Sequence, residues 1–292
     1  RKLRLLLRSA CTIFVRKFPA MRRKLIIGLC ILVVLLAGIG IYLRNGFYGN
    51  CVPERRSLYV RSGSEYRTLE DSLDAAIAHT AFFRFYARHI ELDRSFKPGH
   101  YVLEPGMNVV QVARMLKLGL QTPVRVTINN VRTPAQLAGK LARQIEADSA
   151  TIVGALTDPA TARKAGLDSV TLFSMFIPDT YEFYWTVSPA QFIERMRREY
   201  DRFWTPQRDA KRQRSGLSRL EVMTLASIVY EETRQSDEMP RIAGVYINRL
   251  RKGWPLQADP TVKYALQEFG LRRILHRHLK YPSPYNTYIN KG

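Results

Sequence analysis

The longest hydrophobic feature of the chain is an uncharged stretch near its N-terminal end, Leu25 to Leu43, which reads LIIGLCILVVLLAGIGIYL. A helix of this length, rising about 1.5 Å per residue, spans roughly the hydrocarbon thickness of a bilayer. A surface helix of a soluble domain keeps a polar face, and this stretch has none. We therefore predict a transmembrane helix over residues 25–43, followed by a linker at residues 44–64.

Mixed helical and strand patterns follow the linker. The alternation of PVRVTI at 123–128 predicts a strand with Val126 and Ile128 on one face. Asn108 is suited to cap a helix that Gly119 ends. Together with two earlier helices and a short strand, these patterns predict a small α+β module at about residues 65–130. The earlier elements are expected at Leu69–Ala78, Ala81–Leu92 and His100–Leu103.

Residues 131–292 favour helices, and three helix starts carry a capping-box sequence. In this sequence Ser or Thr is followed three residues later by Gln or Glu, which satisfies free N–H groups of the first turn. A further helix is predicted over about Glu238–Lys252, with a loop at 254–262 after it. The fold class is therefore α+β, with a transmembrane helix, a small mixed module and a larger, mainly helical domain. The three boxes begin at Thr133, Ser188 and Ser218.

The distribution of the +21 net charge predicts how the transmembrane helix is oriented. Residues 1–44 hold ten of the 46 basic residues and no acidic residue. Most of the ten lie in a basic arm at residues 1–24. Residues 45–292 hold the other 36 basic residues and all 25 acidic residues, so they carry a net charge of +11. By the positive-inside rule the N-terminus is cytoplasmic and the rest is external. A cleaved signal peptide is the less consistent alternative, because no A-x-A site ends the stretch. Arg1 and Met21 both stay open as the true first residue.

Composition excludes several classes of protein. Hydrophobic residues make up 46% of the chain, which allows a sizeable core and excludes a disordered chain. The strong positive charge suggests nucleic acid, but the predicted topology places the basic body outside the cytoplasm, and base-reading motifs are missing. The five histidines lack zinc-site spacing and no phosphate-binding glycine loop is present, so we predict no metal site and no cofactor.

The densest polar group lies at the end of the helix that Ser218 opens, in SRLEVMTLASIVYEETRQSDE. Glu232 follows Ile228 by four residues and Val229 by three, so it projects from the same stripe as these apolar residues. Glu231 lies on a more polar stripe. A carboxyl group on an apolar wall favours its protonated form, which a general acid near neutral pH requires. The spacing leaves open the alternative of a helix-end carboxylate paired with an arginine.

Neutral polar and aromatic side chains gather after this helix. Amides, hydroxyls and aromatic rings suit a sugar, because they hydrogen bond to its hydroxyl groups and stack on its ring faces. Asp-Pro and Tyr-Asn are also ordinary turn sequences, so a purely structural role stays open. The candidates for positioning a sugar or supporting the site are Asn248, Gln257, Asp259, Thr261, Tyr285 and Asn286.

Five ordered segments resemble the YceG-like endolytic murein transglycosylases of bacteria. LASIVYEET, AGVYINRL, LQADPTV and SPYNTY follow one another in the family's order, and FIPDTYEFYW at 176–185 is similar to an earlier segment. The stretch at 97–124 is similar to the family's LysM-like subdomain, so the resemblance covers about residues 60–292. Relatives continue beyond the position of Gly292, so the resemblance implies a C-terminally truncated domain.

The resemblance implies a single-pass protein of the bacterial inner membrane, with a LysM-like subdomain at 65–130 and a periplasmic catalytic domain at 131–292. Such an enzyme cleaves the β-1,4 bond between N-acetylmuramic acid and N-acetylglucosamine in nascent glycan strands, leaves 1,6-anhydromuramyl ends and limits strand elongation. The family's catalytic glutamate corresponds to Glu232, and an earlier carboxylate of some relatives is Tyr230 here.

The resemblance also implies partners. Peptidoglycan glycan strands and the inner membrane are expected, peptidoglycan synthases are further candidates, and nucleic acid is not expected. A membrane-tethered, non-catalytic peptidoglycan-binding protein is the alternative function. Oligomeric state and the preferred glycan length stay open.

Overall fold

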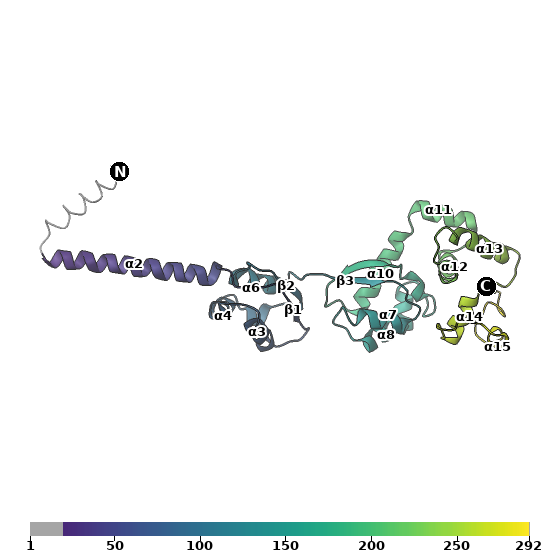
Figure 1. Ribbon diagram of the computed structural model, residues 1–292, viewed down its shortest axis with the longest axis horizontal. Coiled ribbons are helices and arrows are strands. Elements are labelled where there is room, and N and C mark those ends of the chain that lie inside the picture. The colour runs from purple at the N-terminus through teal and green to yellow at the C-terminus, as the bar shows by residue number, and fades with distance from the viewer. Residues whose placement is uncertain (1–19, 292) are drawn as a thin grey trace. The chain divides into compact units, whose positions relative to one another are not determined.

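The computed structural model describes residues 20–291. Residues 1–19, which belong to the predicted basic arm, lie outside the described residues. The chain divides into two compact units, unit 1 at Arg1–Pro123 and unit 2 at Val124–Gly292 (Figure 1). Helices and strands occur in both units, and helices predominate, which confirms the mixed and mostly helical character expected from the sequence.

Unit 1 begins with the helix α2 (Ala20–Tyr48). Its portion from Lys24 to Tyr48 is long and apolar enough to cross a membrane, by length and composition. Large apolar side chains are exposed along this portion on every side of the helix, an arrangement that lipid accepts and water disfavours. The apolar helix predicted at residues 25–43 is therefore present, and it extends to Tyr48.

The body of unit 1 holds the end of α2 directly. α2 packs against α4 (Thr80–His89) and α6 (Val109–Leu118). Gly46 permits this packing, because a Cβ atom at that position would lie 2.3 Å from the Phe82 ring. Cys51, just after the helix, is fully buried. The structure thus differs from the linker expected at 44–64, since apolar residues of this segment contribute to the core.

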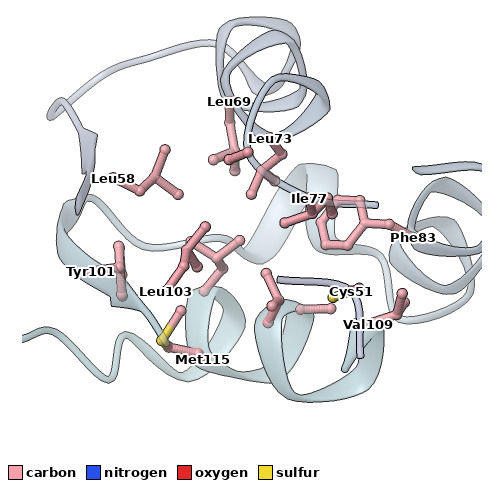
Figure 2. Close-up of a cluster of buried hydrophobic side chains, with 14 of the residues drawn as sticks. Cys51, Leu58, Leu69, Leu73, Ile77, Phe83, Tyr101, Leu103, Val109 and Met115 are labelled. Carbon is pink, nitrogen blue, oxygen red and sulfur yellow. The ribbon is translucent and has the colours of Figure 1, made fainter. Parts of the chain in front are cut away.

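A two-stranded antiparallel sheet and four helices form the remainder of unit 1. β1 (Arg56–Val60) pairs with β2 (Gly99–Leu103), and Leu58 lies opposite Tyr101. Their apolar faces enclose a single core in which Leu73, Phe83 and Leu103 are fully buried, as Figure 2 shows. The helices between and after the strands are α3 (Tyr66–Asp74), α4, α5 (Leu92–Ser95) and α6.

Local signals predicted this part of unit 1 well. The expected pair of helices corresponds to α3 and α4, and the expected strand corresponds to β2. Asn108 and Gln111 form a reciprocal capping box at the start of α6, and Gly119 ends that helix with a φ of 69°. A positive φ is available to glycine at little cost.

Unit 2 opens with a second antiparallel pair of strands. β3 (Val124–Ile128) pairs with β4 (Asp179–Phe183), and Val126 lies opposite Tyr181. The segment 124–128 therefore belongs to unit 2, whereas the sequence analysis placed it in the small module. Two observations place the strand in unit 2: it pairs with β4, and its residues Val126 and Ile128 are buried in the core of that unit.

Helices around this sheet build the first of two hydrophobic clusters in unit 2, which contains Phe176, Phe192 and Met196. All three predicted N-caps are present, since Thr133, Ser188 and Ser218 each accept from the third N–H of their helix. The reciprocal box forms at Ser188 and Ser218, whereas at Thr133 the Gln136 side chain accepts from the N–H of Arg132 instead. The helices of this part are α7 (Pro134–Leu141), α8 (Ser149–Thr157), α9 (Pro159–Lys164), the 3-10 helix η1 (Leu172–Met175), α10 (Pro189–Phe203) and α11 (Pro206–Ser215).

The second hydrophobic cluster of unit 2 is smaller and includes Leu225, Ile228, Val229 and Tyr246. Part of the loop expected at 254–262 is helical, because proline is compatible with the first turn of a helix and the Asp-Pro pair begins one. The helices of this part are α12 (Arg219–Glu232), α13 (Met239–Arg251), α14 (Asp259–Leu266) and α15 (His276–Leu279).

Candidate active site

α12 carries Glu232 at its C-terminal end. Leu225, Ile228 and Val229 are buried, which confirms the predicted apolar stripe, and Glu232 continues that stripe to a position where the residue is exposed. Thr233 leaves the helix with extended backbone angles. The helix therefore ends where its carboxyl-bearing residue leaves the core, so the carboxyl group faces solvent and not the apolar wall that the sequence analysis expected.

Tyr246 of α13 holds the Glu232 carboxyl group in place. The Tyr246 hydroxyl donates a hydrogen bond of 2.8 Å to Oε1 of Glu232. The ring of Tyr246 is buried against the second hydrophobic cluster. Burial raises the pKa of Tyr246, and the hydrogen bond to Glu232 and its negative charge raise the pKa further. The hydroxyl consequently stays protonated and remains a donor at neutral pH.

Among residues 20–291, Oε2 of Glu232 has no hydrogen-bond partner within the protein. One carboxylate oxygen is thus fixed by Tyr246, while the other is available to a substrate. A carboxyl group in this arrangement can give a proton and take one back with little reorganisation. The pairing with an arginine, which the spacing had left open for Glu232, belongs instead to its neighbour Glu231.

Glu231 is neutralised by Arg132, which lies between β3 and α7. Nε of Arg132 donates to Oε1 of Glu231 at 3.2 Å, and Nη2 donates to Oε2 at 2.9 Å. The Arg132 guanidinium also lies 5.2 Å from the centroid of the Phe269 ring. Two-point contact of this kind fixes a guanidinium and a carboxylate in one plane. The two adjacent carboxylates therefore have different partners, one cationic and one neutral.

A second contact ties the same loop to the end of α12. Asn130 adopts a φ of 48°, and its Oδ1 accepts from the Tyr230 hydroxyl at 2.9 Å and from Nη1 of Arg234 at 3.3 Å. Asparagine is among the residues that most readily adopt such a conformation. Tyr230 therefore has a structural contact in this chain.

Asp259 and Tyr288 extend the group around Glu232. The Tyr288 hydroxyl donates to Oδ1 of Asp259 at 2.6 Å. Burial raises the pKa of Tyr288 to about 12, with further contributions from the hydrogen bond and charge of Asp259 and from the charge of Glu232; the Arg249 guanidinium opposes them. Arg249 also donates to the carbonyl oxygen of Leu256. The charge of Glu232 thus raises the pKa of both Tyr246 and Tyr288, whereas that of Asp259 raises the pKa of Tyr288.

Three other predicted residues are Thr261 in the first turn of α14, and Gln257 and Asn286 in loops. Thr261 is buried, and its hydroxyl bonds to the Ala258 carbonyl at 2.7 Å and to the Thr287 hydroxyl at 2.9 Å. Asn286 is fully buried and donates to two carbonyl oxygens of its own loop. Gln257 is exposed, with a φ of 53°. The contacts of Asn286 agree with the structural role that the sequence left open, since its amide is buried and engaged within the protein.

The remaining predicted residues, Asn248 and Tyr285, are both exposed. Asn248 follows Tyr246 by two positions on α13, a rotation of about 200° around a helix, so it projects away from the hydrogen bond to Glu232. Tyr285 packs edge-on against Tyr264, with 4.9 Å between ring centroids. The structure thus brings Asp259 into the group around Glu232 and leaves Asn248 outside it.

Sequence reasoning did not single out Tyr246 as a site residue. In the sequence it is one more large residue on the apolar face of a helix, and only the packing of α13 against α12 places its hydroxyl on Glu232. Tyr288 was noticed within SPYNTY without an assigned role. A tyrosine at the margin of an apolar stripe is the signal that would have suggested a buried ring with a bonded hydroxyl.

Curated relatives of the chain bear the name of a single class of enzyme, endolytic murein transglycosylase. The chain is 25% identical over 253 residues to the one from Bacillus subtilis strain 168, covering 81% of this chain and 70% of that protein. It is 24% identical over 267 residues to the one from Streptococcus pneumoniae serotype 2 strain D39. That match covers 80% of this chain and 48% of the relative, so the chain spans about half the length of the streptococcal protein.

The chain belongs to the YceG-like family, whose model matches residues 58–292. The fold agrees with this assignment. A crystal structure of a YceG-like protein from Listeria monocytogenes is similar with a TM-score of 0.53 and 26% sequence identity, covering 82% of this chain and 84% of that one. The matched residues include every element that builds the group around Glu232.

Proposed function

We propose that the chain is a peptidoglycan lytic transglycosylase in which Glu232 is the catalytic acid and base. It would cleave the β-1,4 bond between N-acetylmuramic acid and N-acetylglucosamine within nascent glycan strands, and so limit strand elongation. The observation that carries the proposal is the hydrogen bond from Tyr246 to Glu232. It fixes one oxygen of an exposed carboxyl group, within the residues that match the YceG-like family.

The proposed reaction needs a single carboxyl group in two successive roles. Protonated Glu232 first donates its proton to the glycosidic oxygen that leaves. The resulting carboxylate then accepts the proton of the muramyl 6-hydroxyl, whose oxygen closes on C1 and forms the 1,6-anhydro ring. Most glycosidases use a second carboxylate to activate water or attack C1. Here the nucleophile belongs to the substrate, which agrees with the engagement of Glu231 by Arg132.

The neighbouring residues take supporting roles in this proposal. Exposed Gln257 and Tyr285 would contact sugar or N-acetyl groups, and Asn248 would contact a more distant part of the strand. Asp259 and Thr261 support the site by holding Tyr288 and the loop before α14.

The direct test compares two neighbouring carboxylates of the same helix. Glu232→Gln is expected to reduce the release of anhydromuramyl ends from purified glycan strands by about 10²- to 10⁴-fold, the usual range for a general acid–base group. Glu231→Gln is the matched control and should retain most activity. Full activity of Glu232→Gln, or products with reducing muramic ends, would contradict the proposal. If wild-type protein co-sediments with peptidoglycan without cleaving it, the chain is instead a wall-binding protein.

Unit 1 would attach the enzyme to the membrane on the side that faces the cell wall. We propose that α2 crosses the inner membrane once with its N-terminus in the cytoplasm, since basic residues precede the apolar stretch and acidic ones are absent there. The arrangement of β1, the helices α3 and α4, the short helix α5 and β2 supports the proposal of a LysM-like role for this unit. Peptidoglycan synthases, which build nascent strands at the same membrane, are the proposed neighbours.

A further inference from the structure

Aromatic side chains gather where α2 meets α4 in unit 1. The Phe82 ring lies 5.3 Å from the Tyr42 ring and 5.0 Å from the Phe47 ring, measured between centroids. Phe47 in turn lies 5.9 Å from Phe85. Phe85 is nevertheless 68% exposed, and Tyr48 at the end of α2 is 66% exposed. A partly exposed aromatic cluster therefore continues directly from the apolar helix onto the body of unit 1.

The position of this aromatic cluster along α2 determines how deep it would lie in a bilayer that α2 spans. Arg44 is the first charged residue after the uncharged stretch. Phe47 follows three residues later, about 4.5 Å farther along the helix axis. Phe85 contacts Phe47 and so shares its level. If α2 spans a bilayer, Phe85 lies at the depth of the lipid headgroups, where aromatic side chains are enriched.

The charges of α4 also fit a membrane surface. The helix contains Arg84, Arg88 and His89 and no acidic residue. Arg84 is engaged by Glu70 and Asp74 of α3. Arg88 and His89 are exposed and follow Phe85 by three and four residues, which places them beside it on the same helix face. Basic residues next to an exposed aromatic side chain are typical of helices that lie on anionic lipid.

We propose that α4 docks on the surface of the same bilayer that α2 spans. Phe85 inserts at the level of the headgroups beside Tyr48, and Arg88 and His89 lie near the lipid phosphates. The docking goes beyond the proposed enzymatic function and rests only on the insertion of α2. Unit 1 is then held by two membrane contacts, which prevents it from swinging away from the surface.

Tryptophan fluorescence of the full chain in vesicles tests this docking. The vesicles contain phosphatidylglycerol and phosphatidylcholine brominated near the headgroup end of the acyl chain. The three native tryptophans all lie in unit 2. Their fluorescence is measured in the wild-type protein and subtracted from that of each variant. Phe85→Trp is the test variant, since an exposed ring tolerates the larger side chain. Tyr59→Trp, at an exposed residue of β1, is the matched control, and Leu36→Trp reports insertion of α2.

We expect the added fluorescence of Phe85→Trp and Leu36→Trp to be quenched, and that of Tyr59→Trp to be unaffected. Quenching at Leu36→Trp with none at Phe85→Trp would overturn the docking and leave the anchor intact. If the tryptophan at position 85 is shielded from iodide but is not quenched by the brominated lipid, protein rather than lipid covers this face of α4. That result would also overturn the membrane docking. None of these readouts depends on transglycosylase activity.

Discussion

The hydrogen bond between Tyr246 and Glu232 predicts a measurable loss of catalysis in Tyr246→Phe. This substitution removes only the hydroxyl group and keeps the buried ring. A hydrogen bond to a charged group contributes about 1.5–3 kcal/mol. Glu232 is exposed, so water can partly replace the donor, and we expect a value below this range, about 1 kcal/mol. That energy corresponds to about a fivefold lower rate if the bond holds Glu232 in its reactive orientation.

The assay is the release of anhydromuramyl ends from glycan strands, with kcat and KM determined separately. A positioning role lowers kcat and leaves KM nearly unchanged, because the ring and the sugar contacts remain. Tyr181→Phe is the matched control: it also removes one tyrosine hydroxyl of unit 2, which donates to the Ile177 carbonyl at 2.7 Å. The reasoning is refuted if Tyr246→Phe retains the wild-type kcat, or loses no more than Tyr181→Phe.

Two further predictions concern stability. Gly46→Ala should lower the thermal unfolding midpoint of unit 1 in detergent, because overpacking against Phe82 costs about 1–3 kcal/mol. Gly38→Ala is the control and should leave the midpoint unchanged, because no atom lies within 4 Å of its added Cβ. Equal midpoints for the two variants would contradict the packing. Burial raises the pKa of Tyr101 from 10.0 to about 12, so the contribution of Tyr101 to the free energy of unfolding should be constant below pH 10 and fall between pH 10 and 12. Urea denaturation against pH tests this, and Tyr101→Phe should weaken the fall.

Elements whose signals lie within a few residues were predicted correctly from the sequence. The capping boxes at Ser188 and Ser218 and the glycine at the end of α6 are examples. Each such signal acts between neighbouring N–H and C=O groups, so it needs no knowledge of the rest of the fold. The apolar stripe that leads to Glu232 is local in the same sense, because it depends only on the helical repeat.

Features that depend on distant partners were not predicted. The sequence predicts a linker where β1 lies and assigns the strand 124–128 to the small module, whereas it belongs to unit 2. Both assignments depend on partner strands more than thirty residues away. The role of Asn286 was decided by burial, and that of Tyr246 by the packing of two helices. Sequence patterns name the residue types at a site, whereas the tertiary contacts determine which of them face one another.

The contacts of Asn130 and Arg132 have a consequence for how firmly the end of α12 is held in unit 2. Its two hydrophobic clusters are distinct, and beside the site they are joined by polar contacts, namely an ion pair, two hydrogen bonds and a guanidinium over a ring. Contacts of this kind contribute about 1 kcal/mol or less each. α12 also contacts η1 of the first cluster. The polar contacts beside the site are therefore the weaker part of this attachment, and salt would screen the ion pair among them.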